Sequence, residues 1–257
     1  QVTIASQSHR RKDLVGIIDW RVAEAGHLGV DLRCNVYADV EDVLALDPDL
    51  VIVATGGLPD IGFLGESQDL VTDTWETLTA GSHLSGDILL FDDAGGHPGL
   101  DAAEFLAKRG ARLEYVTPGR VIAPEVGPLT SPGYLRTFAE ADVSVTLSYS
   151  LTRVRRASDN RLVAELYNEY AEKTVERTVD HVVVEHGTLP NDDLYFRLIA
   201  HSTNLGEVDY EAFVAIQPQT LNRNPGGRFQ LFRIGDAVAS RNIHAAIYDA
   251  VRLGMAV

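Results

Sequence analysis

The sequence predicts an α/β protein built on parallel sheets, for three reasons. Apolar, β-branched runs alternate with helical patterns along much of the 257 residues. Two of these runs, at 49–57 and 87–96, end in glycine pairs. The second run is followed directly by a helical pattern, which gives the order strand, glycine turn and helix. Uninterrupted apolar runs of this kind are typical of strands that are buried on both faces of a parallel sheet.

The first 57 residues are predicted to alternate between strands and helices. In chain order we expect a strand at 1–6, a helix at 12–28, a strand at 31–38, a short helix at 39–46 and a buried strand at 49–57. Gly29 ends the first helix. Cys34 lies in the second strand, where we expect it to be a small core residue.

The middle of the chain repeats the pattern. A strand at 88–91 precedes a helix that packs Leu100, Ala103 and Leu106 inward and stops at Gly110. A further strand at 111–119 and a helix at 131–140 follow. Polar and apolar residues then alternate, which predicts antiparallel strands with one solvated face at 142–157, 161–168 and 174–187.

The last part of the chain is rich in loops. Asp192 and Asp193 are expected to cap the helix that follows them. A strand at 229–236 precedes a final helix that begins near Ile243. Four residues of this helix share one predicted apolar face: Ile247, Ala250, Val251 and Gly254.

Composition excludes several function classes. Twenty-two basic residues against 37 acidic residues give a formal net charge of -15. A surface this acidic repels nucleic acid and anionic lipid, and it is compatible with docking to a basic face of another protein. No apolar run approaches the roughly 20 residues that cross a bilayer, and no signal peptide opens the chain. We therefore expect a cytoplasmic protein.

Neither a metal site nor a catalytic side chain is predicted in this chain. The eight histidines show no paired ligand spacing, and no GxSxG elbow occurs. The single cysteine excludes an internal disulfide and a cysteine-only metal site.

The segment RIGDAVASRNIHAAIYDAVRLG carries the strongest binding signal. A strand runs into Gly235 and Asp236, and Asn242 is well placed as the N-cap of a helix. A glycine lets a ligand approach the backbone, and a carboxylate accepts hydrogen bonds from a sugar or ribityl hydroxyl. The helix N-terminus offers free N–H groups to a phosphate or a flavin carbonyl. The alternative is a simple turn with a helix cap.

Two further glycine segments follow the same logic. VATGG ends a buried strand at Gly56 and Gly57, where a plain tight turn is as good an explanation. DDAGGHPG at 92–99 resembles a dinucleotide loop, with Ala94, Gly96 and Gly99 at the three glycine positions. Asp92 and Asp93 would repel a pyrophosphate there, Pro98 lacks an N–H, and Thr117 replaces the expected ribose-binding acid. This second site therefore has the architecture of a dinucleotide site with impaired chemistry, and the sequence leaves both NAD(P)H binding and its loss as alternatives.

Four segments together resemble a known family. DLVIVATGGLP, FDDAGGHPGLDAAEFLAKRG, VVVEHGTLPNDDLYF and RIGDAVASRNIHAAIYDAVRLG are similar to the C-terminal half of the trimethylamine dehydrogenase and 2,4-dienoyl-CoA reductase family. These are flavin oxidoreductases related to old yellow enzyme. Within it, the chain resembles most the demethylases of N-methylated amino acids and betaines. The resemblance spans nearly the whole chain.

The resemblance implies a longer protein. Family members carry an upstream TIM barrel with FMN, a four-iron cluster (4Fe-4S) and the substrate site, none of which this chain supplies. It also implies two Rossmann-like, three-layer domains of the FAD/NAD(P)-binding type, the second inserted in the first. We place the FAD/ADP-binding-like domain at 1–84 plus 190–257 and the inserted NAD(P)-binding-like domain at 85–189. The first domain is expected to be truncated at its N-terminus, after a glycine-rich loop.

The family's binding positions transfer to this chain residue by residue. Thr55, Gly56 and Gly57 match its ATG segment, and Gly235 and Asp236 match its GD motif, both at the FAD or ADP site. Asn242, Ile243 and His244 match the start of the last helix. The second nucleotide loop is matched by Gly95, Gly96, His97 and Gly99. No catalytic residue is carried over.

The resemblance therefore implies the nucleotide-binding portion of an oxidative N-demethylase or amine dehydrogenase that passes electrons to an electron-transfer protein. The fragment alone would be inactive, and the full-length enzyme would be a homo-oligomer. One alternative is an NAD(P)H-dependent enoate reductase. The other is a non-catalytic scaffold that binds a partner protein.

Overall fold

The computed structural model describes residues 1–257, apart from the side chain of Ser82. The chain divides into two compact units, and we describe each by itself. Unit 1 contains residues 1–31 and 59–187, and unit 2 contains residues 32–58 and 188–257. The domain boundaries that we expected from the sequence stay a prediction. Among the described residues, no helix is both long enough and apolar enough to cross a bilayer.

Unit 1 is built on a parallel sheet of five strands. Their spatial order is β3 (Thr72–Asp73), β10 (His181–Glu185), β4 (Asp87–Asp92), β5 (Arg112–Thr117) and β6 (Ser144–Leu147). A separate antiparallel sheet contains β7 (Ser150–Arg156), β8 (Leu162–Asn168) and β9 (Lys173–Val179). The helices are α1 (Val2–Ala5), α2 (Val15–His27), α4 (Thr74–Ala80), α5 (His97–Lys108) and α6 (Ser131–Glu140), with 3₁₀ turns at His9–Leu14, Gly62–Leu70 and Gly81–His83.

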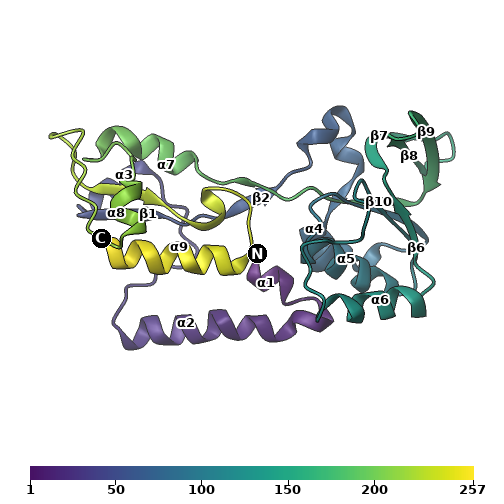
Figure 1. Ribbon diagram of the computed structural model, residues 1–257, viewed down its shortest axis with the longest axis horizontal. Coiled ribbons are helices and arrows are strands. Elements are labelled where there is room, and N and C mark those ends of the chain that lie inside the picture. Colours follow the sequence, from purple (N-terminus) through teal and green to yellow (C-terminus); the bar gives the residue numbers. More distant parts are fainter. The chain divides into compact units, whose positions relative to one another are not determined.

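These elements form three layers, because β4 sends alternate side chains to opposite faces. Ile88 and Leu90 pack in one core with residues of α5 and α6, among them Leu106 and Tyr134. Leu89 and Phe91 pack in a second core with the antiparallel sheet β7–β9. Figure 1 shows α5 and α6 close to the parallel strands. The predicted α/β class with three layers is confirmed for this unit.

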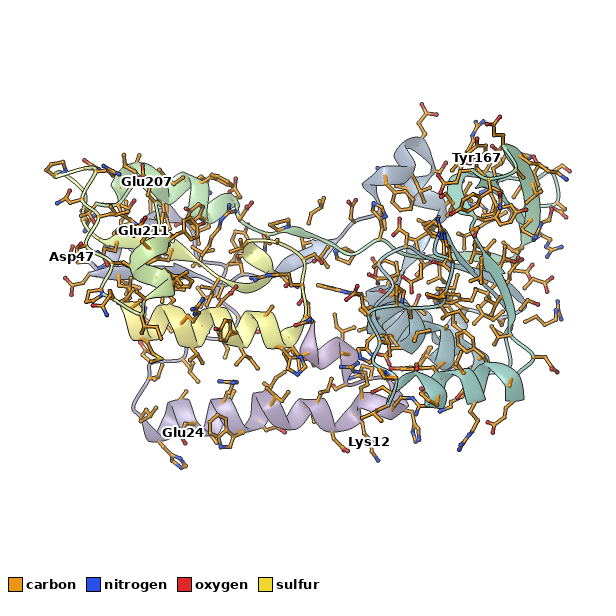
Figure 2. All side chains as sticks on the ribbon, in the orientation of Figure 1. Lys12, Glu24, Asp47, Tyr167, Glu207 and Glu211 are labelled. Atoms are coloured by element: carbon orange, nitrogen blue, oxygen red, sulfur yellow. The ribbon has the colours of Figure 1, made fainter. Side chains whose placement is uncertain are left out.

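Unit 2 has a smaller sheet. β1 (Leu50–Val53) and β12 (Gln230–Arg233) pair in parallel, and the short strands β2 (Gly57–Pro59) and β11 (Thr188–Pro190) pair separately. Its helices are α3 (Val40–Ala45), α7 (Asp193–Leu198), α8 (Tyr210–Val214) and α9 (Ile243–Ala256), with 3₁₀ turns at Ile199–His201 and Gly235–Ala237. Val53, Leu231 and Leu198 lie in its core. Acidic side chains such as Asp47, Glu207 and Glu211 are exposed on this unit (Figure 2).

Two predicted strands do not form. Residues 2–5 make the short helix α1, in which Ala5 N–H donates to the Gln1 carbonyl at 2.8 Å. Residues 31–38 are irregular, and Asn35 has a positive φ of 58°. Neither segment has a neighbouring strand to pair with. Cys34 is consequently exposed, so its predicted place in the core is wrong.

Three other predictions need correction. The strands at 144–147 and 181–185 pair in parallel in the five-stranded sheet, although alternation suggested antiparallel pairing. β1 is not buried on both faces, since Ile52 is 39% exposed. In α9 the residues buried are Leu253 and Ala256, whereas Ala250, Val251 and Gly254 of the predicted face are exposed. Helix periodicity identified this helix correctly but not the side that meets the core.

Candidate functional site

In unit 2, two predicted glycine segments leave the same edge of one sheet. Val53 and Arg233 are partners in the parallel pair, and Ile234 N–H donates to the Val53 carbonyl at 3.1 Å. The segments that follow, 54–57 and 234–236, therefore emerge side by side at the carboxyl ends of the strands. This is the edge at which open α/β sheets bind ligands.

The glycines at this edge are required by the backbone. Gly56 and Gly235 have φ values of 75° and 62°, a conformation that other residues rarely adopt. A Cβ on Gly57 would lie 2.7 Å from Thr188 Oγ1 and 2.8 Å from the Leu189 carbonyl oxygen. The hydroxyl of Thr188 is buried without a hydrogen-bond partner among the described residues. Ala54 and Thr55 beside them are small and exposed, while the Gly56 carbonyl accepts from Asn191 N–H at 2.9 Å and the Thr55 hydroxyl donates to the Asn191 carbonyl.

Hydrogen bonds to residues in and just before the helix that follows fix the position of the GD motif. Gly235 N–H donates to the Asp249 carboxylate of α9 at 3.1 Å, and Arg241 forms an ion pair with the same carboxylate. Asp236 accepts a hydrogen bond from Arg241 N–H at 3.2 Å. This single bond leaves lone pairs of the Asp236 carboxylate for a hydroxyl ligand.

The start of α9 confirms the predicted N-cap. Asn242 Oδ1 accepts from Ala245 N–H at 3.0 Å. The N–H groups of Ile243 and His244 have no acceptor among the described residues. The first turn of this 14-residue helix therefore keeps backbone donors and a partial positive charge facing outward.

Sequence reasoning missed an arginine at the same edge. Arg233, the last residue of β12, forms an ion pair with Asp192, and its guanidinium lies 4.8 Å from the Tyr195 ring centroid and 5.2 Å from that of Phe196. Asp192 occupies the N-cap position of α7 but makes no side-chain cap bond there. The expectation that it caps this helix is therefore wrong. The sequence did offer a signal for it: an arginine at the end of a predicted strand, two residues before the GD motif.

In unit 1, the side chain of Asp92 fills the turn that follows β4. Asp92 is fully buried and accepts from Gly95 N–H at 2.9 Å and from the Tyr115 hydroxyl. Its carboxylate occupies the space where a Cβ on Gly99 would lie. Burial raises the pKa of Asp92 to about 6, against the opposing hydrogen bonds from Tyr115 and Gly95.

A second buried acid lies beside the first. Glu185 at the end of β10 is the register partner of Asp92. It accepts from the Thr74 hydroxyl and from Gly187 N–H, the latter at 3.0 Å. Burial raises the pKa of Glu185 to about 7, and the nearby Asp92 raises it further.

An acid–histidine pair completes this edge. His186 Nδ1 lies 2.7 Å from Asp93 Oδ2, and its ring stacks on Phe63 with 4.1 Å between centroids. Burial raises the pKa of Asp93, while His186 opposes that rise. Three carboxylates, those of Asp92, Asp93 and Glu185, thus lie at the carboxyl ends of β4 and β10.

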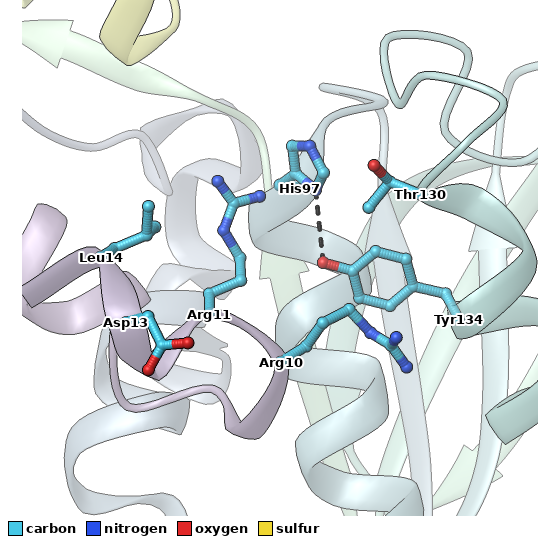
Figure 3. Close-up of a pocket in the computed structure, with 7 residues that line it drawn as sticks. All are labelled: Arg10, Arg11, Asp13, Leu14, His97, Thr130 and Tyr134. Carbon is cyan, nitrogen blue, oxygen red and sulfur yellow. Dashed lines mark hydrogen bonds between the residues drawn. The ribbon is translucent and has the colours of Figure 1, made fainter.

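A cavity of about 340 Å³ lies near the start of α5. Figure 3 shows Arg11 and His97 beside Tyr134, with Arg10 below the tyrosine ring. His97 Nδ1 lies 3.2 Å from the Tyr134 hydroxyl, which donates to Asp101 at 2.7 Å. Burial, and then the charge of Arg11, lower the pKa of His97 to about 4. His97 is therefore neutral in this cavity near neutral pH.

The arginines of this cavity are already paired with acids. Arg10 binds Glu104 with Nη2 at 2.6 Å and Nε at 3.2 Å. Arg11 Nε lies 3.7 Å from Asp101 Oδ2. Burial raises the pKa of Asp101 to about 6. Arg10 and Arg11 thus form ion pairs with carboxylates of α5.

The structure places the predicted positions in two groups. Eight of them lie in unit 2: Thr55, Gly56, Gly57, Gly235, Asp236, Asn242, Ile243 and His244. The other four, Gly95, Gly96, His97 and Gly99, lie in unit 1. Their binding roles stay predictions. Among the described residues, no group of His, Cys, Asp and Glu side chains could hold a metal ion.

Comparison with known proteins identifies relatives of nearly the whole chain. It is 47% identical over 253 residues to a probable N-methylproline demethylase of Rhizobium meliloti (strain 1021), covering 98% of this chain and 37% of that protein. It is 41% identical to the N,N-dimethylglycine/sarcosine dehydrogenase of Chromohalobacter salexigens, covering 98% of this chain and 38% of that protein. The resemblance to the trimethylamine dehydrogenase family is confirmed. The chain spans 37–38% of the length of these relatives.

Further comparisons agree on the fold. The chain is 37% identical to a multifunctional alkene reductase/demethylase of Caballeronia cordobensis, covering 100% of this chain and 38% of that protein. The structure of histamine dehydrogenase from Rhizobium sp. 4-9 matches with a TM-score of 0.72 at 20% identity, covering 98% of this chain and 38% of that one. A thioredoxin reductase of Lactococcus lactis matches 79% of this chain and 63% of its own with a TM-score of 0.56 at 16% identity. No family model matches the chain.

Proposed function

We propose that this chain is the nucleotide-binding portion of a flavin-dependent oxidoreductase that oxidises an N-methylated amine. In that reaction the N-methyl carbon gives up a hydride equivalent, and water hydrolyses the resulting iminium to formaldehyde and the demethylated amine. The proposal rests on relatives named as a demethylase and a dehydrogenase of such amines. FMN, the iron–sulfur cluster and the substrate site would belong to parts of the protein outside these 257 residues.

Unit 2 would hold the FAD or ADP of this enzyme. Its residues fit such a group, because the sheet edge at 54–57 and 234–236 turns at glycines and exposes the small side chains of Ala54 and Thr55. The carboxylate of Asp236 would accept from a sugar hydroxyl. The free N–H groups of Ile243 and His244 would face a phosphate or a flavin carbonyl. The role of this region would be binding and orientation, without a proton-transferring side chain.

Unit 1 would not accept NAD(P)H, and one observation carries this part of the proposal. The carboxylate of Asp92 takes the Gly95 N–H that a pyrophosphate would need, and it lies against Gly99. Asp93 and Glu185 add further acidic groups at the same strand ends. A pyrophosphate carries about two negative charges there, so both its hydrogen bonds and its electrostatic stabilisation are lacking. The electrons would therefore go to a protein acceptor, for which the net charge of -15 favours a basic docking face.

Native mass spectrometry of the chain tests the assignment directly. ADP, FAD and NADH are added in turn to the chain as isolated. We expect ADP or FAD to be retained in one copy and NADH not to bind. A dissociation constant for NADH in the low micromolar range would contradict the proposal for unit 1. Failure of all three nucleotides to bind would favour the non-catalytic scaffold instead.

An NAD(P)H-dependent enoate reductase is the second candidate. It is favoured by the relative whose name combines alkene reductase with demethylase. Mixing the flavin-loaded full-length enzyme anaerobically with NADH separates the two candidates. Bleaching of the flavin by NADH supports the reductase, whereas bleaching by an N-methyl amine alone supports the demethylase.

A further inference from the structure

The cavity beside α5 contains an arginine whose charge is poorly matched. Arg11 Nε is buried and has no hydrogen-bond partner among the described residues. Its ion pair with Asp101 spans 3.7 Å, which is longer than the roughly 3 Å of a hydrogen bond. Arg10 differs, because it binds Glu104 through both Nη2 and Nε. Since the Arg11 side chain lines the cavity and is 21% exposed, its guanidinium can be reached by a ligand with a carboxylate.

His97 presents an unprotonated ring nitrogen in the same cavity. The Tyr134 hydroxyl gives its one proton to Asp101 Oδ1 at 2.7 Å. His97 Nδ1, at 3.2 Å from that hydroxyl oxygen, must therefore carry a hydrogen and donate it. The pKa of His97, which burial and then the charge of Arg11 lower to about 4, leaves no second proton on the ring near neutral pH. Nε2 is thus an acceptor, and it forms no hydrogen bond among the described residues.

Two further polar groups line the cavity. Thr130 occupies the N-cap position of α6, yet its hydroxyl makes no cap bond, although a threonine there usually accepts from the first turn. Figure 3 shows Arg11 and Thr130 on either side of His97. Asp13 contributes a carboxylate to the lining. A cation, a bare acceptor, a hydroxyl and an anion therefore meet around one hollow of unit 1.

We propose that this cavity binds a free α-amino acid, with its carboxylate on Arg11 and Thr130 and its ammonium group on His97 Nε2 and Asp13. The volume of about 340 Å³ lies at the small end of ligand pockets, which span roughly 300–1,000 Å³. A phosphate or a simple carboxylate fits less well, because it would bring acceptor oxygens against the acceptor nitrogen of His97 and the carboxylate of Asp13. The inference concerns unit 1 and does not depend on the proposed reaction.

Nuclear magnetic resonance of the chain with isotope-labelled histidine tests the proposal, and glycine is the probe. The variant His97→Gln identifies the resonances of His97. We expect the free protein to hold the His97 hydrogen on Nδ1, and glycine to shift the Nε2 resonance in a saturable way. Two analogues separate the contacts. N,N,N-trimethylglycine keeps both charges but has no N–H donor, and acetate keeps the carboxylate alone. Each should bind at least ~10-fold more weakly than glycine.

Variants locate the carboxylate contact. Arg11→Gln should raise the dissociation constant for glycine at least ~10-fold. Arg136→Gln is the matched control, since Arg136 is exposed on α6 and does not line the cavity. Thr130→Val should raise the dissociation constant about threefold. Because Thr130 makes no cap bond, this variant should fold as the wild type does, and it keeps the test valid if Arg11→Gln is unstable.

Four results would overturn the proposal. A His97 hydrogen on Nε2 removes the acceptor, and an Nε2 resonance that glycine leaves in place shows that no ammonium group binds there. Acetate or N,N,N-trimethylglycine binding as tightly as glycine would show that the cavity holds any carboxylate. Unchanged glycine affinity in both Arg11→Gln and Thr130→Val would place the ligand elsewhere. None of these results involves nucleotide binding or turnover, so the proposed function is tested separately.

Discussion

The two units end strands of similar sequence, VIVATGGLP at 51–59 and VVVEHGTLP at 182–190, in different chemical environments. In unit 1, β10 ends at Glu185 and is followed by His186, and Asp92 at the end of β4 and the following Asp93 lie beside them. In unit 2, β1 runs into Ala54 and Thr55, which are small and exposed. Both segments then turn at a glycine with positive φ, Gly187 in the first and Gly56 in the second. The backbone plan is therefore shared, and the difference lies in side chains.

This difference shows that the backbone layout of a nucleotide-binding edge can be kept while side chains change what the edge can bind. The carboxylates of unit 1 satisfy the backbone donors of their own turn, so the turn is stable without a ligand. In unit 2, Asp249 of α9 accepts from Gly235 N–H and Asp192 pairs with Arg233, but the N–H groups of Ile243 and His244 have no acceptor among the described residues. A phosphate could bind these donors in unit 2 without displacing an internal bond, whereas in unit 1 it would compete with Asp92 for Gly95 N–H.

The largest expected effect comes from removing the buried amide of Asn204, whose Oδ1 accepts from Leu231 N–H and whose Nδ2 donates to the Leu231 carbonyl, each at 2.9 Å. Asn204→Leu keeps the approximate volume but removes both bonds to Leu231. Two buried backbone groups lose their partners, so we expect the free energy of unfolding to fall by about 3 kcal/mol. Urea denaturation measures it. Asn222→Leu, the same change at an exposed position of unit 2, is the control and should change stability little. A loss from Asn204→Leu that is no larger than the control's would contradict this role of the amide.

Most regular elements of both units could be predicted, because each has a local signal. Periodicity identified α5, α6 and α9, and Asn242 was recognised as a cap from its place before an apolar helix. The misses have a different cause. Residues 31–38 have strand composition but pair with no strand among the described residues. The hydrogen bonds of the Asn204 side chain to Leu231 join segments 27 residues apart, which no local pattern reveals. Asp92 could be seen to repel a phosphate, but its bonds to Gly95 and Tyr115 depend on tertiary packing.

The second prediction concerns how the free energy of unfolding depends on pH through Glu185. Burial raises the pKa of Glu185 to about 7, so the folded state keeps a proton that the unfolded state releases near pH 4 to 5. The stabilisation that protonated Glu185 contributes is therefore complete below about pH 4 to 5, and it is lost as the pH rises through about 7. Between about pH 5 and 8 we expect a loss of about 2 kcal/mol in the free energy of unfolding.

Urea denaturation of the wild type and of Glu185→Gln, across that pH range, measures this loss. The glutamine cannot ionise, so its profile should be flatter than the wild-type profile. Unit 2 has Ala54 at the equivalent position and offers the internal comparison, because exchange of its core amides should be less sensitive to pH. Identical pH profiles for the wild type and Glu185→Gln would show that Glu185 does not titrate as described.

The third prediction separates the two units by ligand. Asp236→Asn removes the charge that would accept from a sugar hydroxyl in unit 2, and we expect the dissociation constant for ADP to rise about tenfold, or about 1.4 kcal/mol. Asp92→Asn, the matched change in unit 1, should leave ADP binding unchanged. Isothermal titration calorimetry measures both constants. An effect of Asp92→Asn on ADP with none from Asp236→Asn would reverse the assignment of the two sites.

The smallest expected effect distinguishes a structural from a ligand role at the start of α9. Asn242→Ala removes the bond to Ala245 N–H, so the free energy of unfolding should fall by about 1 kcal/mol. Asn242→Asp keeps a capping oxygen and should preserve stability, but it places a negative charge next to the N–H groups of Ile243 and His244. If a phosphate binds there, ADP affinity should fall in the aspartate variant although its stability does not. Thermal unfolding and ADP titration of the two variants together decide the matter. Equal ADP affinity in wild type and Asn242→Asp would mean that this helix start is a cap and that the ligand lies elsewhere along the edge.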